Sequence, residues 1–237
     1  MISIADLRRR LQAAADPGRA PAMRAYMKSD MPFHGVPTPL RRTITKALWT
    51  EAPPTDAATW RSQVADLWDA ATHREERYAA LDWCHWPWLA DRRRVRFGFH
   101  DPEALPLFER LIVGGAWWDL VDELAGHHVG RVLFRHRAET ATILRRWAVG
   151  DDLWKRRSAI LAQLDHGPDL EVGLLVDCIR PSLAPSPFAK EFFIAKAIGW
   201  ALRQHARSDA AWVREFVQQH RLGLPALSQR EALRRIA

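Results

Sequence analysis

The chain has 237 residues, of which 48% are hydrophobic and 27% charged, and this ordinary globular usage excludes a disordered or fibrous chain. Lysine and arginine outnumber aspartate and glutamate by 35 to 28, which gives a formal charge of +7 and is compatible with a polyanionic partner. No apolar run approaches the roughly 18 residues that cross a bilayer, and the first residues lack the order of regions of a signal peptide. We therefore expect neither a membrane protein nor a secreted one.

Helical periodicity runs through almost the whole chain, because apolar residues recur at spacings of three and four. Extended alternation with turn-flanked β-branched runs is absent, so the sequence predicts an all-α protein. The helical pattern covers Ile4–Leu11, Val64–Trp83, Phe108–Leu133, Ile143–Ala148, Leu153–Leu164, Leu170–Ile179, Phe192–Ala206 and Trp212–Val217. Several breaks end in a residue suited to cap the next helix, namely Thr55 or Asp56, Asp101 and Ser208.

The breaks are regularly spaced. A basic residue followed by a small or apolar core recurs at Arg77, Arg157, Lys196 and Arg230, and a further helix begins near Trp117. Spacings of about 40 residues, each filled by two helices, are typical of HEAT or armadillo-like repeats. We therefore expect a curved helical solenoid in which equivalent helices line one concave face.

The two cysteines, Cys84 and Cys178, form no CxxC motif, which argues against a disulfide scaffold or a structural zinc site and favours a reducing cytoplasm. His127, His128 and the other histidines form no HExxH or similar set, so we expect no metal site. The basic run Asp91–Arg94, with Arg96, is expected to be a solvated loop or helix end.

Candidate chemistry begins in the segment WWDLVDELAG. Trp117, Val121 and Leu124 have the spacing of a core stripe. Trp118 and Asp122 are also four residues apart, each one position after Trp117 and Val121. They therefore lie side by side on the neighbouring face of the helix. An indole beside a carboxylate at this place has no obvious packing purpose.

The helix over 192–207 repeats the arrangement. Its core positions are Ile194, Ile198 and Ala201, and its second stripe is Lys196, Trp200, Arg203 and Arg207. In the helix after Trp154, Arg157 takes the corresponding position. Taken singly, these tryptophans fit core packing, Asp122 fits a solvated or capping acid, and Arg157 fits a surface ion pair. Their convergence on one face of a solenoid favours the functional interpretation.

Several motifs follow one another in a distinctive order. They are Tyr26-Met27-Lys28, FHGVPTP at 33–39, Arg41-Arg42, WWDLVD at 117–122, LWKRRSAIL at 153–161, FFIAKAIGWALR at 192–203 and LSQREALRRI at 227–236. In these motifs, and over essentially the whole chain, the sequence resembles the AlkD-type DNA alkylation-repair glycosylases.

The resemblance implies a single HEAT-like solenoid domain over residues 1–237, with a basic concave cleft that wraps duplex DNA. It implies excision of cationic N3- and N7-alkylated purines, such as 3-methyladenine and 7-methylguanine, without metal or cofactor. The family's catalytic aspartate falls on Asp122, its DNA-facing tryptophans on Trp118 and Trp200, and its active-site arginine on Arg157. The expected DNA contacts are Tyr26, Lys28, Arg156, Lys196, Arg203, Arg207 and Arg230.

Such a reaction is consistent with a single carboxylate. An N3- or N7-alkylpurine already carries positive charge and leaves as a neutral base, so no general acid is required. Asp122 would stabilise the oxocarbenium-like deoxyribose and orient the attacking water. Trp118 and Trp200 would cradle the cation, and Arg157, with Arg156 beside it, would hold a backbone phosphate.

The family is understood to act with the lesion still stacked in the duplex, so bulky cationic adducts should also be accepted. We expect a monomer that acts on double-stranded DNA in the cytoplasm. Two alternatives remain open at this point: a non-catalytic HEAT-repeat protein that binds distorted or branched DNA, and a protein scaffold whose basic groove takes an acidic peptide. A carboxylate in the path of an anionic ligand weighs against the first, and the second should show no preference for alkylated over undamaged duplex DNA.

Overall fold

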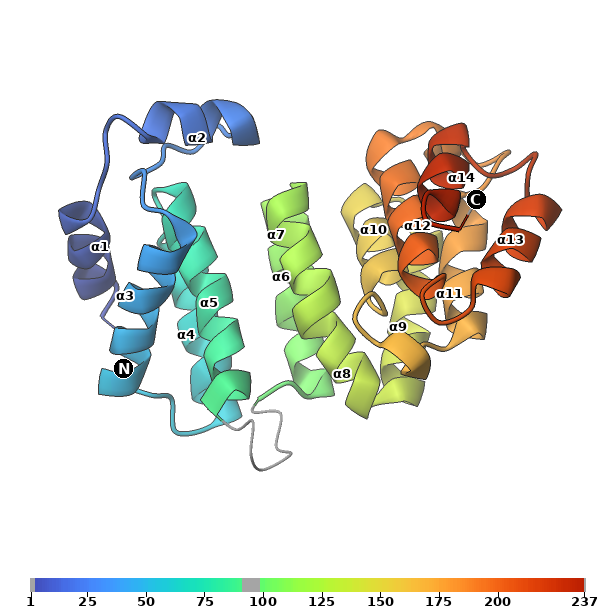
Figure 1. The fold of residues 1–237 in the computed structure, drawn as a ribbon. Helices are drawn as coiled ribbons and strands as arrows, with labels where there is room; N and C mark the ends of the chain where they lie inside the picture. Colours follow the sequence, from blue (N-terminus) through green and yellow to red (C-terminus); the bar gives the residue numbers. More distant parts are fainter. Residues whose placement is uncertain (1–2, 91–98, 237) are drawn as a thin grey trace. The chain divides into compact units, whose positions relative to one another are not determined.

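The computed structural model describes residues 3–90 and 99–236, and every regular element in these ranges is helical (Figure 1). The all-α prediction is therefore confirmed. Contacts within the chain divide it into two compact units, Met1–Phe99 and His100–Ala237. The single domain expected over 1–237, and the curvature of its cleft, stay predictions, and the run at 91–94 with Arg96 lies outside the described residues.

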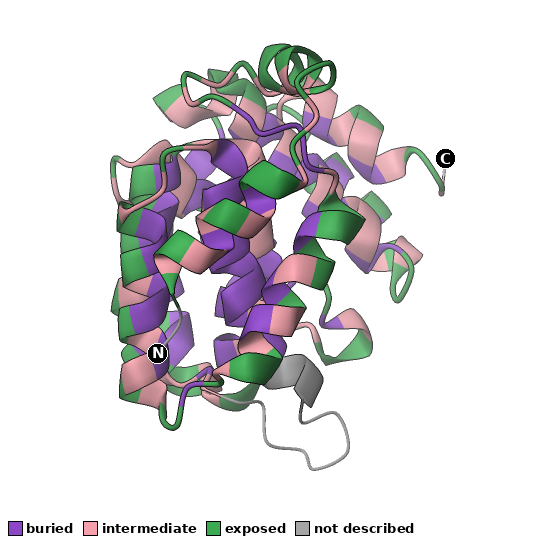
Figure 2. Cartoon of the chain, turned by 90° about the vertical axis from the view of Figure 1, so that its left-hand side faces the viewer, coloured by how far each residue is buried: buried purple, intermediate pink, exposed green. Residues whose placement is uncertain are grey.

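The first unit consists of α1 (Ile4–Ala13), α2 (Ala20–Met27), α3 (Thr38–Glu51), α4 (Ala57–Asp69) and α5 (Arg74–Ala90). Its core includes the indoles of Trp60 and Trp83, both fully buried. The N–H groups of these two indoles have acceptors: Trp60 donates to the Trp83 carbonyl at 3.1 Å and Trp83 to Gln63 Oε1 at 2.9 Å. Figure 2 shows the buried residues gathered on the helix faces that meet one another.

The continuous helix predicted over Val64–Trp83 is wrong, because the chain breaks between α4 and α5. The Glu76 carboxylate accepts the backbone N–H of Thr72 at 2.8 Å, which caps the start of α5 instead of continuing α4.

Periodicity also missed α2 and α3. In α2 no side chain is buried, so it has no apolar stripe to detect.

The second unit begins with η1 (Pro102–Ala104), α6 (Leu105–Gly115), α7 (Trp118–Asp122), the π-helix η2 (Glu123–Val129) and α8 (Gly130–Arg135). It continues with α9 (Arg137–Val149), α10 (Leu153–Leu161), η3 (Gly167–Asp169), α11 (Val172–Ile179), η4 (Arg180–Ser182), η5 (Pro187–Lys190), α12 (Phe192–His205), α13 (Ala210–Gln219) and α14 (Ala226–Leu233).

The core stripes predicted for this unit are confirmed at most positions. Val121, Leu124, Ile194 and Ile198 are completely buried and Ala201 is nearly so. Trp117 is different: it adopts an extended conformation before α7 and is only half-buried. The backbone explains this, because Ala116 has a φ of 40° and ends α6, so the helix predicted over Phe108–Leu133 is interrupted.

Helix caps also decide where helices start. Asp56 caps α4 as one of the two predicted candidates, accepting the Thr59 N–H at 2.7 Å. Asp101 precedes η1 as predicted, without a side-chain cap. The cap predicted at Ser208 is instead Asp209, which accepts the Trp212 N–H at 2.9 Å. Within the described ranges, no helix has both the length and the apolar character to span a membrane.

Candidate active site

The short helix α7 presents Trp118 and Asp122 together. Its inward side carries Leu120 and Val121, which are completely buried, whereas Trp118 and Asp122 are partly exposed. Residues four apart on a helix are neighbours on its surface, so the indole and the carboxylate lie on one side of α7. The face predicted from the sequence is present, although the helix begins only at Trp118.

Arg157 of α10 pairs with Asp122 in a bidentate arrangement. Its Nε donates to Asp122 Oδ1 at 2.7 Å and its Nη2 to Oδ2 at 2.8 Å. The Arg157 side chain is 5% exposed and that of Asp122 is 16% exposed. The structure thus directs Arg157 toward the carboxylate, whereas the sequence analysis expected it to face a phosphate.

Aromatic residues hold Arg157 in this orientation. Its Nη1 donates to the Phe193 carbonyl, and its Cζ lies 5.8 Å from the centre of the Phe193 ring. The Phe193 ring in turn packs on Trp117 and Trp154, at centroid distances of 5.4 and 5.0 Å. The start of α7, α10 and the start of α12 therefore converge around one ion pair.

The environment of Asp122 changes its acidity. Burial raises the pKa of the Asp122 carboxyl above its ordinary value of 3.8, and the nearby charge of Asp119 adds to this. The hydrogen bonds and charge of Arg157 act in the opposite direction without cancelling it. A carboxylate in such a partly desolvated place interacts strongly with a positive charge that develops beside it.

A π-helix follows Asp122 directly. The segment Glu123–Val129 is wound more widely than an α-helix, and such segments are frequent at functional sites. Its outer side is tied to the chain after α10, because His127 Nδ1 lies 3.1 Å from Asp165 Oδ2. The Asp165 carboxylate raises the pKa of His127, with a further contribution from Glu123. Periodicity counts gave no sign of the π-helix.

The outward stripe of α12 lies within the same unit. Trp200 is half-buried, seven residues and about two turns beyond Phe193. Lys196 and Arg203, on either side of Trp200 along the helix, both bond to Glu231 of α14. Arg207 and Arg230 are exposed.

Arg156 does not lie where the sequence analysis expected a phosphate contact. It is 6% exposed, and its guanidinium donates to the carbonyls of Gly150 at 2.6 Å and Pro181 at 3.0 Å. The group also lies 3.9 Å from the centre of the Phe188 ring. Consecutive residues of a helix point about 100° apart, so Arg156 faces the protein interior when Arg157 faces Asp122.

Tyr26 and Lys28 belong to the first unit. Tyr26 is 74% exposed at the end of α2, and Lys28 follows it with a φ of 47°. Lys28 lines a hollow of about 720 Å³ together with Arg24 and His34. The two residues are accessible, as a DNA contact requires.

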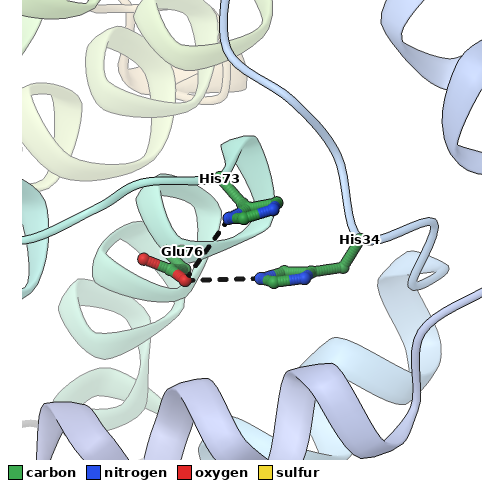
Figure 3. A group of neighbouring side chains, drawn as sticks. All are labelled: His34, His73 and Glu76. Atoms are coloured by element: carbon green, nitrogen blue, oxygen red, sulfur yellow. Dashed lines mark hydrogen bonds and ion pairs between the residues drawn. The ribbon is translucent and has the colours of Figure 1, made fainter.

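Two histidines and a glutamate of the first unit lie close together (Figure 3). Ligand atoms of His34, His73 and Glu76 all lie within 4.8 Å of one another. The two imidazoles are stacked, however, with centroids 3.8 Å apart and planes inclined by 10°. A metal ion bonds an imidazole nitrogen along its in-plane lone pair, and two nearly parallel rings do not direct these lone pairs at one point. This conformation therefore does not form a metal site.

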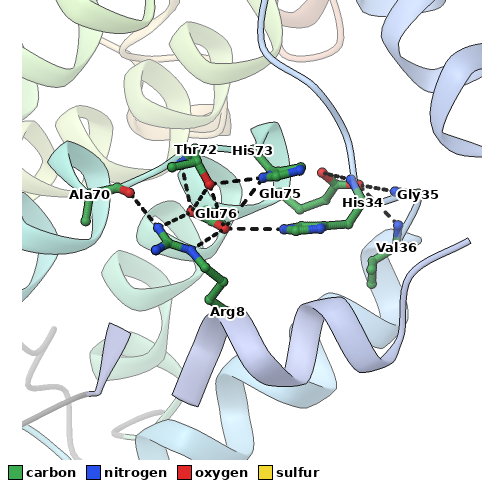
Figure 4. A network of polar contacts seen from close by, with 9 residues as sticks. All are labelled: Arg8, His34, Gly35, Val36, Ala70, Thr72, His73, Glu75 and Glu76. Carbon is green, nitrogen blue, oxygen red and sulfur yellow. Dashed lines mark hydrogen bonds and ion pairs between the residues drawn. The ribbon is translucent and has the colours of Figure 1, made fainter. Parts of the chain in front are cut away.

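The same glutamate is the centre of a hydrogen-bond network (Figure 4). Arg8 donates to both Glu76 oxygens at 3.0 Å, and His34 Nε2 lies 3.3 Å from one of them. Burial favours the neutral acid, but the hydrogen bonds from His34 and Arg8 outweigh it and hold the pKa of Glu76 far below its usual range. Next to it, Glu75 accepts the backbone N–H groups of three consecutive residues, 34–36. The network joins α1, the chain before α3 and the start of α5.

Sequence reasoning missed two features of the candidate site. One is Glu231, whose partners Lys196 and Arg203 lie about 30 residues earlier, so no local pattern joins them. The other is Phe192, an exposed aromatic residue at the first position of α12. The signal available in the sequence was the pair of phenylalanines that opens FFIAKAIGW. Two consecutive residues at a helix start cannot both face inward, so one of the two rings must face outward.

Comparison with known proteins identifies the class. A solved structure described as a predicted DNA alkylation repair enzyme from Enterococcus faecalis is similar to this chain, with 29% identity and a TM-score of 0.78. The match covers 94% of this chain and 97% of the other. The fold is thus that of an all-helical DNA-repair protein.

The family can be stated more closely. A model of the DNA alkylation repair enzyme family matches residues 7–236, and the chain belongs to this family. A search of curated proteins gives no match. Family membership supports a role in the repair of alkylated DNA, with DNA as the partner.

Proposed function

We propose that this protein is a monofunctional DNA glycosylase of the AlkD type that removes cationic N3- and N7-alkylated purines from duplex DNA and leaves an abasic site. The observation that carries the proposal is the state of Asp122. Among the described residues its two oxygens accept hydrogen bonds from Arg157 alone, so each retains a lone pair, and the carboxylate is partly exposed beside Trp118. This side of the carboxylate can therefore accept a hydrogen bond from water or face a positive charge that develops beside Trp118.

In the proposed reaction, the bond between C1′ of deoxyribose and the purine nitrogen breaks, and its electron pair neutralises the cationic base, which leaves. The carboxylate of Asp122 stabilises the positive charge that develops on the sugar. Water then forms a bond to C1′ and transfers its proton to Asp122, from which it passes to solvent. The products are a neutral alkylpurine and an abasic site.

The other residues bind and orient. Arg157 fixes the carboxylate through two parallel hydrogen bonds, which is the strongest geometry for such a pair. Trp118 and Trp200 offer aromatic faces to the cationic nucleotide, an interaction of about 0.5–2 kcal/mol each. Lys196, Arg203, Arg207, Arg230, Tyr26 and Lys28 are proposed as contacts to the DNA backbone.

The proposal includes action on a lesion that stays stacked in the duplex, by a monomer that needs no metal or cofactor and works in the cytoplasm. If the base is not drawn into a pocket, its size is not limited, and bulky cationic adducts are accepted as well as 3-methyladenine and 7-methylguanine. This contrasts with glycosylases that extrude the target base.

The test is single-turnover release of 7-methylguanine from methylated duplex DNA by the wild type, Asp122→Asn and Asp177→Asn. Loss of a transition-state electrostatic contact costs on the order of 100-fold or more, so Asp122→Asn should show no measurable release while duplex affinity is kept or raised. Asp177→Asn is the matched control, because it removes an exposed pair with Arg145 in the same unit and should release base normally.

Release by Asp122→Asn at the wild-type rate would refute the role of Asp122. No release by any of the three proteins, with tight duplex binding intact, would instead favour a non-catalytic protein that binds distorted or branched DNA. A preference for acidic peptides without any for alkylated duplex would favour a protein scaffold.

A further inference from the structure

Glu231 of α14 lies between two cations of α12. Its Oε1 is 3.1 Å from Lys196 Nζ, and its Oε2 accepts a hydrogen bond from Arg203 Nη1. The glutamate side chain is 15% exposed, whereas those of Arg203 and Lys196 are 25% and 40% exposed. The carboxylate is thus more buried than either cation that it neutralises.

The backbone holds this glutamate in place. A Cβ atom added at Gly199 would lie 2.6 Å from Glu231 Cβ and 3.2 Å from the Ser228 backbone, so only glycine permits this close approach of α12 and α14. The buried Ser228 Oγ donates to the Ala195 carbonyl at 2.7 Å and fixes the register of the two helices. These contacts fix the position of the Glu231 backbone relative to Lys196 and Arg203 of the neighbouring helix.

The two cations bonded to Glu231 lie beside Trp200 on α12. Lys196 precedes Trp200 by four residues and Arg203 follows it by three, so both cations lie on the side of α12 that carries the indole. The hydrogen bond from Lys196 lowers the pKa of Glu231, with further contributions from the charges of Lys196 and Arg203. At neutral pH an anionic group of α14 therefore lies against the cations of the α12 stripe that is proposed to meet DNA.

We propose that Glu231 occupies the place of a DNA phosphate between Lys196 and Arg203 and so lowers the affinity of the protein for duplex DNA. A phosphate contacts these cations only after it displaces the carboxylate, and in the wild-type complex with undamaged duplex the carboxylate keeps them. The inference rests on the proposed function, because it takes the α12 stripe to be part of the DNA-binding face. Weak binding to undamaged duplex matters to a repair enzyme, since unmodified sites outnumber lesions by many orders of magnitude.

The test is the salt dependence of binding to an undamaged duplex, compared between the wild type and Glu231→Gln. The glutamine has the same shape but competes poorly for the cations, so one more phosphate should be neutralised. The slope of log K against log salt concentration should then steepen by about 0.9, with affinity at physiological salt raised by about fivefold.

Two further variants separate this mechanism from other effects. Glu215→Gln makes the same change of net charge at an exposed position of α13 and should leave the slope unchanged. In the double variant Lys196→Gln/Glu231→Gln, one of the released cations is absent, so the slope should return close to that of the wild type. A disturbed α12–α14 packing would not be repaired by removing Lys196.

An unchanged slope in Glu231→Gln, or an equal steepening in Glu215→Gln, would overturn the inference. Release of 7-methylguanine by the wild type is measured on the same samples. If the wild type excises and the Glu231→Gln slope does not move, only this inference fails. If the wild type neither binds duplex nor excises, the proposed function fails and the inference fails with it.

Discussion

Each unit of the molecule contains an arginine that grips an aspartate with two hydrogen bonds. In the first unit Arg41 donates to the two oxygens of Asp82 at 2.8 and 3.2 Å, and its Cζ lies 5.0 Å from the centre of the Tyr78 ring. In the second unit Arg157 donates to Asp122 at 2.7 and 2.8 Å and lies near the Phe193 ring. By pair geometry alone the two are equivalent.

They differ in what surrounds the carboxylate. Asp82 is 4% exposed and receives additional contacts from Arg42 at 3.4 Å and Thr45 at 3.3 Å, so its hydrogen-bonding capacity is nearly filled. Asp122 is 16% exposed and, within the described ranges, is bonded only to Arg157. The comparison shows that the geometry of an ion pair does not distinguish the two aspartates; Asp122 differs in its accessible, unfilled acceptor capacity, which the proposed function requires.

The largest effect expected from this comparison concerns stability. Asp82→Asn leaves Arg41 buried without its anion, and breaking such a pair costs about 3–5 kcal/mol of the free energy of unfolding. Asp122→Asn also leaves the buried Arg157 without its anion, but it should cost less than Asp82→Asn. The direction of this difference follows from the raised pKa of Asp122: the folded protein favours the neutral acid more than the unfolded chain does, so the ionised form opposes folding at neutral pH. Urea unfolding of both variants measures this, and equal losses would erase the distinction.

The aromatic neighbours offer the next contrast. Trp118→Ala and Trp200→Ala should each lower the single-turnover excision rate by about 3- to 30-fold, because each removes about 0.5–2 kcal/mol of cation–π stabilisation. Their duplex affinity should change less than their rate. Tyr78→Leu is the matched control, since it removes the ring beside the buried arginine of the other pair and should leave excision unchanged. Equal losses of rate and affinity would make the two tryptophans binding residues only.

The smallest effect expected at neutral pH concerns the pKa of Asp122, which the pH dependence of excision reports. Excision requires ionised Asp122, so the rate should fall as the pH falls through its raised pKa, with the midpoint above 3.8. Arg157→Gln removes the contacts that oppose the increase and should move the midpoint to still higher pH. Single-turnover rates across acidic pH, corrected for spontaneous base loss, check this prediction. A midpoint at or below 3.8, or one that Arg157→Gln does not move, would contradict it.

Much of the helical framework could be predicted because its signal is local. Buried apolar residues at spacings of three and four predicted the inward sides of α7 and α12, and the same spacing paired Trp118 with Asp122. Helix caps were predictable to within a residue, as Asp209 in place of Ser208 illustrates. The helix α2 was not, since it buries no side chain and therefore has no pattern.

The partners of charged residues could not be predicted, because they are decided by tertiary contacts. Arg156 and Arg157 are neighbours of one type, and only the packing of α10 determines which of them faces Asp122. Likewise, the pairing of Lys196 with Glu231 joins residues 35 positions apart. The motifs thus predicted where the site residues lie along their helices, whereas their hydrogen-bond partners became known only from the structure.

The π-helix after Asp122 has a consequence for the angular phase of the whole segment. An α-helix turns by about 100° per residue, and a wider turn shifts the orientation of everything that follows it relative to what precedes it. Here the segment Glu123–Val129 lets Asp122 face Arg157 while Val129, Val132 and Leu133 still enter the core. The π-helix thus separates the orientation of α7, which carries Asp122 of the ion pair, from that of α8, which packs in the core. The orientation of Asp122 relative to the core residues of α8 therefore depends on the winding of Glu123–Val129.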